Sequence, residues 1–157
     1  MNNEEAEAWR DKEIAATNYR SKLRDARERK GLTIHEAARL IDSIGHYYDI
    51  EEHEHDFTGC YSLNQITEVC KILGIHPRDL FCDKIPASTL ISEVVDRIKT
   101  HCTEKRISIG EFEEIAGWRV ENCLTNPAKA LEEWGVDCLM DVCRELNIDW
   151  HCVIAGL

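Results

Sequence analysis

The segment LTIHEAARLI, residues 32–41, contains the strongest local structural signals of the chain. Thr33 can cap the free amide groups of a first helical turn, and Glu36 follows three residues later, which is the capping-box arrangement. Gly31 suits the left-handed residue that ends a preceding helix. The segment therefore predicts one helix that ends near residue 30 and another that begins at Thr33, with these residues facing the core: Leu32, Ala37, Leu40 and Ile41.

Helical patterns continue on both sides of this segment. Upstream, they predict a helix over about residues 4–29, whose core side contains Trp9, Ile14, Tyr19, Leu23 and Ala26. Downstream, they predict a short helix over 45–54, a loop around 57–59, and a helix over 62–73 that Ser62 caps and Gly74 ends. No segment alternates apolar and polar residues over the length of a strand, so we expect an all-α fold.

The carboxyl half repeats this order. Residues 69–75 (VCKILGI) line up with 142–148 (VCRELNI) at a shift of 73 positions. The start of the capped helix recurs at a shift of 75, where Leu32, Ile34 and Glu36 correspond to Ile107, Ile109 and Glu111. Chance similarity between amphipathic helices would explain one match, but duplication explains both. We expect two domains, residues 1–83 and 89–157, joined by a linker over 84–88 in which a proline blocks helix continuation.

Two segments resemble a known family. LRDARERKGLTIHEAA (23–38) is similar to the first helix, turn and start of the second helix of lambda-repressor-like, Cro-type helix-turn-helix domains, and VCKILGIHPRDLF (69–81) is similar to their last helix and closing turn. The resemblance covers residues 20–81 and implies a five-helix domain that usually binds operator DNA. It also implies a structural ion pair between Arg27 and Glu51 or Glu52. The chain is thus expected to form two tandem bundles of this type, the second degenerate.

The departures from the family fall on the positions that contact DNA. Family members commonly carry Gln where this chain has Ile34, which cannot donate a hydrogen bond to a phosphate. Seven acids and no Lys or Arg lie between Leu40 and Cys70, around the expected recognition helix. The usual basic loop is replaced by EEHEHDFTG (51–59), and carboxylates there would repel phosphates. In the second half, the segment 118–126 holds a single base, Arg119.

The net charge of the chain also argues against DNA binding. The chain has 30 acids and 19 bases among 157 residues, a formal net charge of −11, which favours cationic partners and opposes contact with nucleic acid. The exception is the region up to residue 31, where basic residues gather on the first helix. They could follow a DNA backbone, although cations in a last helical turn also simply complement the helix dipole.

We therefore expect an acidic protein-binding module of the immunity-protein or antitoxin kind, which inhibits a basic, nucleic-acid-directed protein such as a toxin. The expected partner contacts are His46, Tyr47, Tyr48, Asp49, Glu52, Glu54 and Asp56. The alternative is a Cro-type transcriptional regulator that binds DNA through Arg20, Lys22, Arg24, His46 and Tyr47. An inhibitor could act as a monomer, whereas a regulator would normally be a homodimer.

Other classes of function receive little support from the sequence. No nucleophile, base and oxyanion-forming loop can be recognised together, so we expect no enzyme and no cofactor. His53 and His55 alternate in sequence and lack a second pair at zinc-binding spacing, so we expect no metal site. Most of the eight cysteines are expected to be buried small apolar residues. Without a signal peptide or a membrane span, the protein is expected in the cytoplasm.

Overall fold

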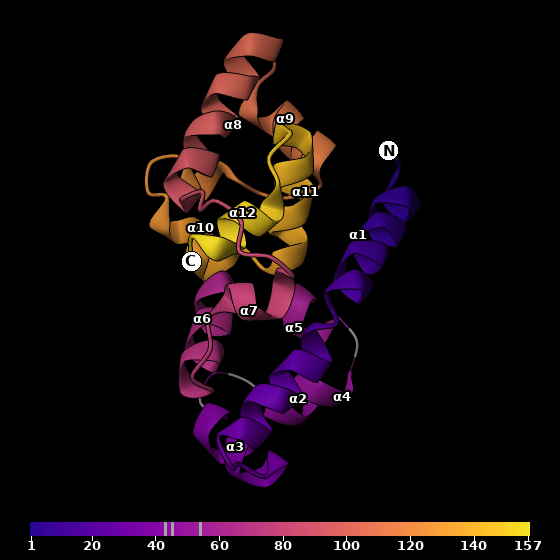
Figure 1. The fold of residues 1–157 in the computed structure, drawn as a ribbon. Coiled ribbons are helices and arrows are strands. Elements are labelled where there is room, and N and C mark those ends of the chain that lie inside the picture. The colour runs from indigo at the N-terminus through magenta and orange to yellow at the C-terminus, as the bar shows by residue number, and fades with distance from the viewer. Residues whose placement is uncertain (43, 45, 54) are drawn as a thin grey trace.

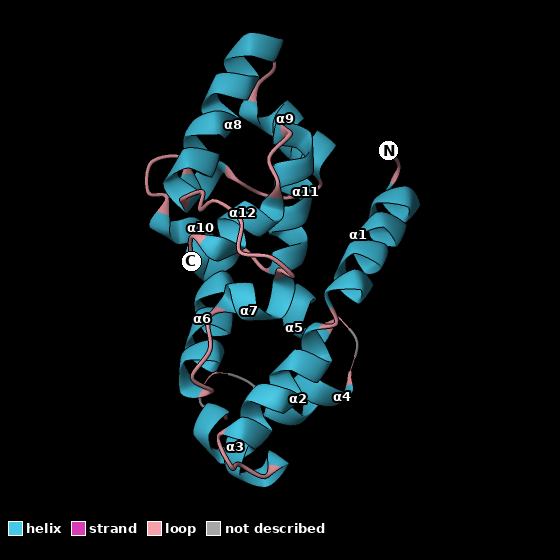
Figure 2. Ribbon diagram, viewed as in Figure 1, coloured by secondary structure: helices cyan, strands magenta, loops and turns pink. Residues whose placement is uncertain are grey.

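The computed structural model describes residues 1–42, 44, 46–53 and 55–157 (Figure 1). Helices are the only regular secondary structure in these residues, which confirms the expected all-α fold class (Figure 2). The elements are α1 (Asn3–Thr17), α2 (Tyr19–Arg29), α3 (Ile34–Ile41), α4 (Tyr47–Glu52), α5 (Asp56–Gly59), α6 (Leu63–Ile72), α7 (Pro77–Phe81), α8 (Ile91–Lys105), α9 (Ile109–Ala116), the 3₁₀ turn η1 (Glu121–Cys123), α10 (Ala128–Glu133), α11 (Val136–Leu146) and α12 (Trp150–Ala155).

The predicted long first helix is two helices. Asn18 adopts the left-handed conformation, with φ 53° and ψ 34°, and turns the chain between α1 and α2. Its backbone N–H donates to the Ala15 carbonyl oxygen over 3.3 Å. The helical periodicity runs through this position because Asn18 interrupts the backbone without interrupting the apolar pattern. Tyr19, Leu23 and Ala26 are buried as expected.

Helices α3 and α6 begin where the caps predict. Thr33 accepts from the backbone N–H of Glu36, and Ser62 accepts from that of Gln65. Two details of the prediction are wrong. Leu40 is 52% exposed, because it lies on the outward side of α3 next to Arg39, whereas the inner side is formed by Ala37, Ala38 and Ile41. The expected loop around 57–59 is the short helix α5, whose Phe57 and Thr58 are buried.

The two halves share an order of elements and of turns. From α2 to α7 the chain forms six short elements, and from α8 to α12, with η1 included, it forms six more. The residues that end α2 and α8 both have positive φ: Gly31 at 72° and Arg106 at 57°. The residues after α6 and α11 do so too, Gly74 at 72° and Asn147 at 55°. These pairs are 75 and 73 positions apart, the shifts at which the sequence repeats.

The halves are packed against each other through a continuous core. Helices α5, α6 and α7 contact α11, α10 and α12 respectively (Figure 1). The backbone N–H of Leu63 donates to the Trp134 carbonyl oxygen over 2.8 Å, and Nε2 of His76 lies 2.8 Å from the Leu157 carbonyl oxygen. Aromatic rings in contact cross the boundary: Phe57 stacks on Phe81, and Phe81 meets Trp150 edge-on. The buried side chains therefore form one apolar cluster across both halves.

The cysteines mostly belong to this core. All eight are free thiols, and five are buried: Cys70, Cys102, Cys123, Cys138 and Cys143. Burial raises the pKa of the Cys70 and Cys143 thiols to about 12, so these groups stay protonated at neutral pH. In the described part of the chain, no helix combines the length and the apolar character needed to cross a lipid bilayer.

Candidate protein-binding site

The short helix α4 is held at the surface by a buried ion pair. Glu51 lies on the inner side of α4, and its Oε1 is 3.0 Å from Nε of Arg27 on α2. The Glu51 side chain is only 5% exposed and that of Arg27 is 11% exposed. This pairing settles the choice between Glu51 and Glu52, which the sequence left open. Burial acts to lower the pKa of Arg27, but the hydrogen bond and charge of Glu51 raise it overall.

Tyr47 and Arg20 complete the buried side of α4. Tyr47 is fully buried, and burial raises the pKa of its hydroxyl far above the ordinary value, with the nearby Glu51 carboxylate adding to the effect. Arg20 donates from Nε and Nη2 to the Glu51 carbonyl oxygen, over 3.1 and 2.9 Å. Because its guanidinium satisfies a carbonyl near the end of α4, Arg20 helps to fix this helix against α2.

The opposite side of α4 faces solvent and is acidic. Tyr48 is 38% exposed, the Asp49 side chain is 42% exposed, and Glu52 is also exposed. The effect of this charge is visible on a neighbour. Burial, followed by the carboxylates of Asp49 and Asp56, raises the pKa of Tyr61 to about 12.

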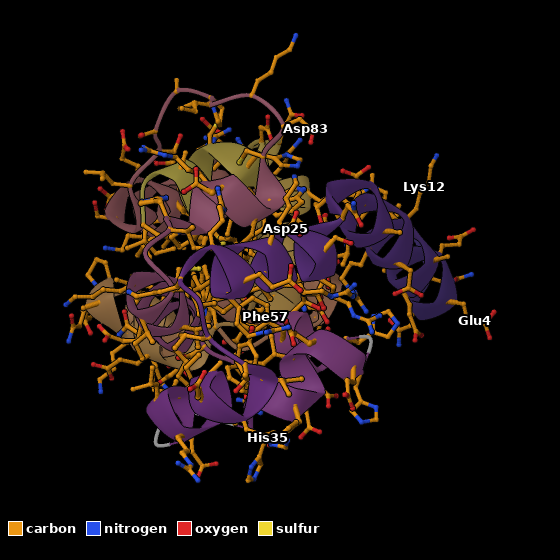
Figure 3. All side chains as sticks on the ribbon, turned by 60° about the horizontal axis from the view of Figure 1, so that its bottom comes forward. Glu4, Lys12, Asp25, His35, Phe57 and Asp83 are labelled. Carbon is orange, nitrogen blue, oxygen red and sulfur yellow. The ribbon has the colours of Figure 1, made fainter. Side chains whose placement is uncertain are left out.

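Histidines are interleaved with these acids. His46 Nδ1 lies 3.6 Å from Asp42 Oδ1, and His53 Nε2 lies 3.7 Å from Asp49 Oδ1. Tyr48 and His35 are joined by a hydrogen bond between the hydroxyl and Nδ1, which ties the outer side of α4 to α3. In Figure 3, His35 lies at the edge of the first half, on the side away from the packed core around Phe57. The surface thus combines carboxylates with aromatic and imidazole rings, and we call it the α4 surface: His35, Asp42, His46, Tyr48, Asp49, Glu52, His53 and Asp56.

Most of the predicted partner contacts lie on the α4 surface. His46, Tyr48, Asp49, Glu52 and Asp56 are exposed or half-buried there. Tyr47 is a correction: the helical turn that exposes Tyr48 points Tyr47 into the core, so it cannot contact a partner or DNA without unfolding α4. Glu54 lies outside the described residues.

The bases predicted for DNA binding are not gathered on this surface. Arg20 is used within the fold, and Lys22 lies 3.4 Å from Asp83, on the side of α2 away from α4. Arg24 is exposed on α2. Lys30 is also used internally, since its ammonium donates to the Ile72 carbonyl oxygen over 2.7 Å.

The prediction missed His35, Asp42 and His53 as members of the site. His53 had a readable signal, because it stands four residues after Asp49, the spacing at which side chains meet on a helix. Asp42 and His46 have the same spacing, but they flank the ends of α3 and α4 and share no helix, so this rule does not predict their contact. His35 had none, because it joins Tyr48 across thirteen positions of sequence. Within the described ranges, no group of three or more His, Cys, Asp or Glu side chains is arranged to hold a metal ion.

Comparisons with family models, with curated proteins and with solved structures gave no match to this chain.

Proposed function

We propose that the chain is a non-enzymatic, acidic protein-binding module on two tandem helix-turn-helix bundles. It acts in the cytoplasm, where its α4 surface binds a basic, nucleic-acid-directed protein such as a toxin, in the manner of an immunity protein or antitoxin. The observation that carries the proposal is the division of charge across α4. Its carboxylates Asp49 and Glu52 face solvent, while the guanidinium groups of Arg20 and Arg27 point inward to Glu51.

The repeated turns support the tandem scaffold. After α2 the N–H of Leu32 donates to Arg27 over 3.2 Å, and after α8 the N–H of Ile107 donates to Cys102 over 3.0 Å. After α6 and α11, Ile75 donates to Cys70 and Ile148 to Cys143, both over 2.9 Å. In each case the donor is the residue after the left-handed one that follows the helix, and this bond is that of a Schellman turn. A duplicated bundle accounts for their recurrence at shifts of 75 and 73 positions.

Charge decides which partner suits the α4 surface. In a helix-turn-helix protein this helix would enter the major groove, where its carboxylates would meet the high negative charge of the phosphates. A basic protein would attract the same carboxylates that phosphates repel, and this attraction would raise the rate of association. Tyr48 adds a large contact area with a polar end, as is typical of residues that dominate protein interfaces.

The alternative, a Cro-type DNA-binding regulator, is favoured by one observation. Arg24 and Arg29 are exposed on α2, where cations could follow a phosphate backbone. The two functions differ in salt dependence. Fluorescence anisotropy with a mixed-sequence duplex DNA, from about 25 to about 200 mM salt, should show no binding if the α4 surface repels phosphates. Binding that weakens steeply with salt would favour the regulator and contradict our proposal.

The protein partner is tested by charge reversal. Immobilised wild-type chain should retain a basic protein from an extract of the source cells, and that protein, once identified and purified, should bind the chain with a submicromolar dissociation constant. Asp49→Lys combined with Glu52→Lys should weaken the purified pair at least about 100-fold, since each reversed contact turns attraction into repulsion. The control is Asp96→Lys with Glu114→Lys, which makes the same change in net charge on exposed residues of the second half. Equal losses in both variants would contradict a site on α4.

A further inference from the structure

Helix α1 is docked on the second half through a buried carboxylate. Asp141 of α11 is 2% exposed, and its oxygens accept from Nη1 of Arg10 over 2.5 Å and from Nη1 of Arg144 over 2.7 Å. The indole N–H of Trp118 donates to the same carboxylate over 2.8 Å. The Arg144 guanidinium also stacks over the Trp9 ring, 5.0 Å from its centroid. Three residues of the second half, Asp141, Arg144 and Trp118, therefore form a seat, and α1 supplies Arg10 and Trp9 to fill it.

A single residue connects α1 to the rest of the chain. Asn18 has left-handed backbone angles between two helices, and the sequence on both sides continues one helical pattern. Changing this residue to the right-handed helical conformation would join α1 and α2 into a straight helix and lift α1 from the seat. Short connections that hold a strained conformation favour exchange of the connected element between chains.

Open space lies beside Asn18. A cavity of about 550 Å³ lies in the bend between α1 and α2, bordered by Asn18, Ile14, Ala15 and Arg24 among others. Ile14 and Thr17 are the buried residues of α1, both near the bend, and the rest of the helix projects at the side of the molecule (Figure 1). Beyond the bend, α1 is held on the second half by Arg10 and Trp9, and on the first half by Asp11, whose Oδ1 lies 3.5 Å from Nδ1 of His55.

We propose that α1 exchanges between two copies of this chain, so that the seat on each copy is filled by Arg10 and Trp9 of the other. The reason is the chemistry of Asp141. A carboxylate this deeply buried is costly when one of its charged donors leaves, so an emptied seat must be refilled. A second copy offers a ligand that matches the seat in every contact, because it is the same helix. The exchanged dimer keeps the contacts of the seat and removes the left-handed conformation at residue 18.

The first test is Asn18→Ala, measured by size-exclusion chromatography with light scattering over a concentration series. Alanine disfavours the left-handed conformation and favours a continuous helix, so the dimer dissociation constant should fall at least about tenfold relative to wild type. Asn147→Ala is the matched control, because Asn147 is also a left-handed residue after a helix, with φ 55°, but lies away from α1. It should remain as monomeric as wild type. Dimerisation of both variants, or of neither, would overturn the proposal.

The second test asks whether a dimer uses the seat. A readout that needs no variant uses wild-type chains labelled with light and heavy nitrogen, mixed at high concentration and cross-linked. Cross-links between α1 of one isotope and α11 of the other should appear and increase with concentration. Links confined to chains of a single isotope would contradict exchange.

Discussion

Individual buried charges fix the position of α4. The Arg27–Glu51 pair is formed between two largely buried side chains, and Arg20 adds two hydrogen bonds to the Glu51 backbone. Burying two charges is costly, so such a pair contributes little net stability relative to apolar residues. Its value is geometric, because only one orientation of α4 satisfies both groups. That orientation determines that Asp49 and Glu52 point outward.

Removing one partner of this pair should be strongly destabilising. Arg27→Ala leaves the Glu51 carboxylate buried without its cation, and we expect the free energy of unfolding to fall by about 3 kcal/mol. Urea denaturation followed by circular dichroism would measure it. Arg29→Ala, which removes an exposed cation two residues away, should change stability by no more than about 0.5 kcal/mol. If both variants lose the same stability, the ion pair is not what holds α4.

Asp137, in the first turn of α11, makes stability depend on pH. Burial raises the pKa of its carboxyl group, although Arg10 and His55 act in the opposite direction. A carboxyl whose pKa is higher in the folded than in the unfolded chain contributes stability below the unfolded pKa, about 3.9, and loses it as the pH rises through the folded value. The folded chain is therefore penalised at neutral pH for ionising this group.

Asp137→Asn should remove that penalty. We expect the free energy of unfolding at about pH 7 to rise by up to about 1 kcal/mol, with a smaller change at acidic pH, where the raised pKa leaves more of the wild-type carboxyl protonated. Urea midpoints at several pH values between these limits would measure it. Asp25→Asn, on the exposed side of α2, serves as the control for simple loss of one negative charge. A larger gain at acidic than at neutral pH would contradict the assigned direction.

At the scale of the helices, caps were predictable and bends were not. Thr33, Ser62 and Ser108 each accept from the backbone N–H three residues ahead, as their sequence spacing indicates. The bend at Asn18 was missed because no local signal requires it. The bend accompanies the contact of Arg10 with Asp141, and these two residues are 131 positions apart in the sequence. Long-range contacts of this kind leave little trace in a single sequence.

The residues of the candidate site were also only partly predictable from the sequence. Tyr47 and Tyr48 were both expected at the partner surface, and only packing against α2 shows that Tyr47 is buried instead. The ion-pair partner of Arg27 was uncertain by one residue for the same reason, since α4 has only six residues and its rotation is set by its neighbours. The seat of α1 had one readable hint. Asp141 is an acid inside the otherwise apolar segment CLMDVC (138–143), where a charge needs a partner.

The capping boxes of the two halves offer a test at this scale. Thr33→Ala and Ser108→Ala remove equivalent caps, 75 positions apart, and each should lower the free energy of unfolding by about 1 kcal/mol. Because the two sites share no contacts, the double variant should lose about 2 kcal/mol, the sum of the single losses. Thermal or urea unfolding of the four proteins measures this. If the double variant is as stable as the less stable of the two single variants, the halves unfold separately.

Across the whole molecule, the halves share one core although the sequence marks them as separate repeats. The linker 84–88 is extended, yet α5, α6 and α7 pack directly on the second half, and aromatic rings continue from Phe57 to Trp150. The acidic surface on α4 is therefore supported by α2, α3 and α5 of the first half, and α5 in turn packs on α11 of the second half. Movement of the second half would be transmitted to α4 through α5, which contacts both α4 and α11.

Gly135, where α11 begins, is the point at which this packing is tightest. A Cβ placed there would lie 2.9 Å from the Thr58 carbonyl oxygen and 3.1 Å from that of Tyr61, both backbone atoms of the first half. Gly135→Ala should therefore force the halves apart locally and lower the free energy of unfolding by about 2 kcal/mol. Gly110→Ala is the matched control. Its Cβ would meet nothing closer than the Ser108 hydroxyl at 3.9 Å, and alanine in helix α9 should add up to about 1 kcal/mol.

The cooperativity of unfolding distinguishes a shared core from two independent ones. We expect wild type to unfold in a single transition, with tryptophan fluorescence and far-ultraviolet circular dichroism coincident in urea. Trp118, Trp134 and Trp150 all lie in the second half, so fluorescence mainly reports that half, whereas circular dichroism reports both. In Gly135→Ala the two curves should separate, because weakened contact between the halves lets one unfold before the other. Coincident curves with a normal midpoint in this variant would mean that the contact at Gly135 does not couple the two halves.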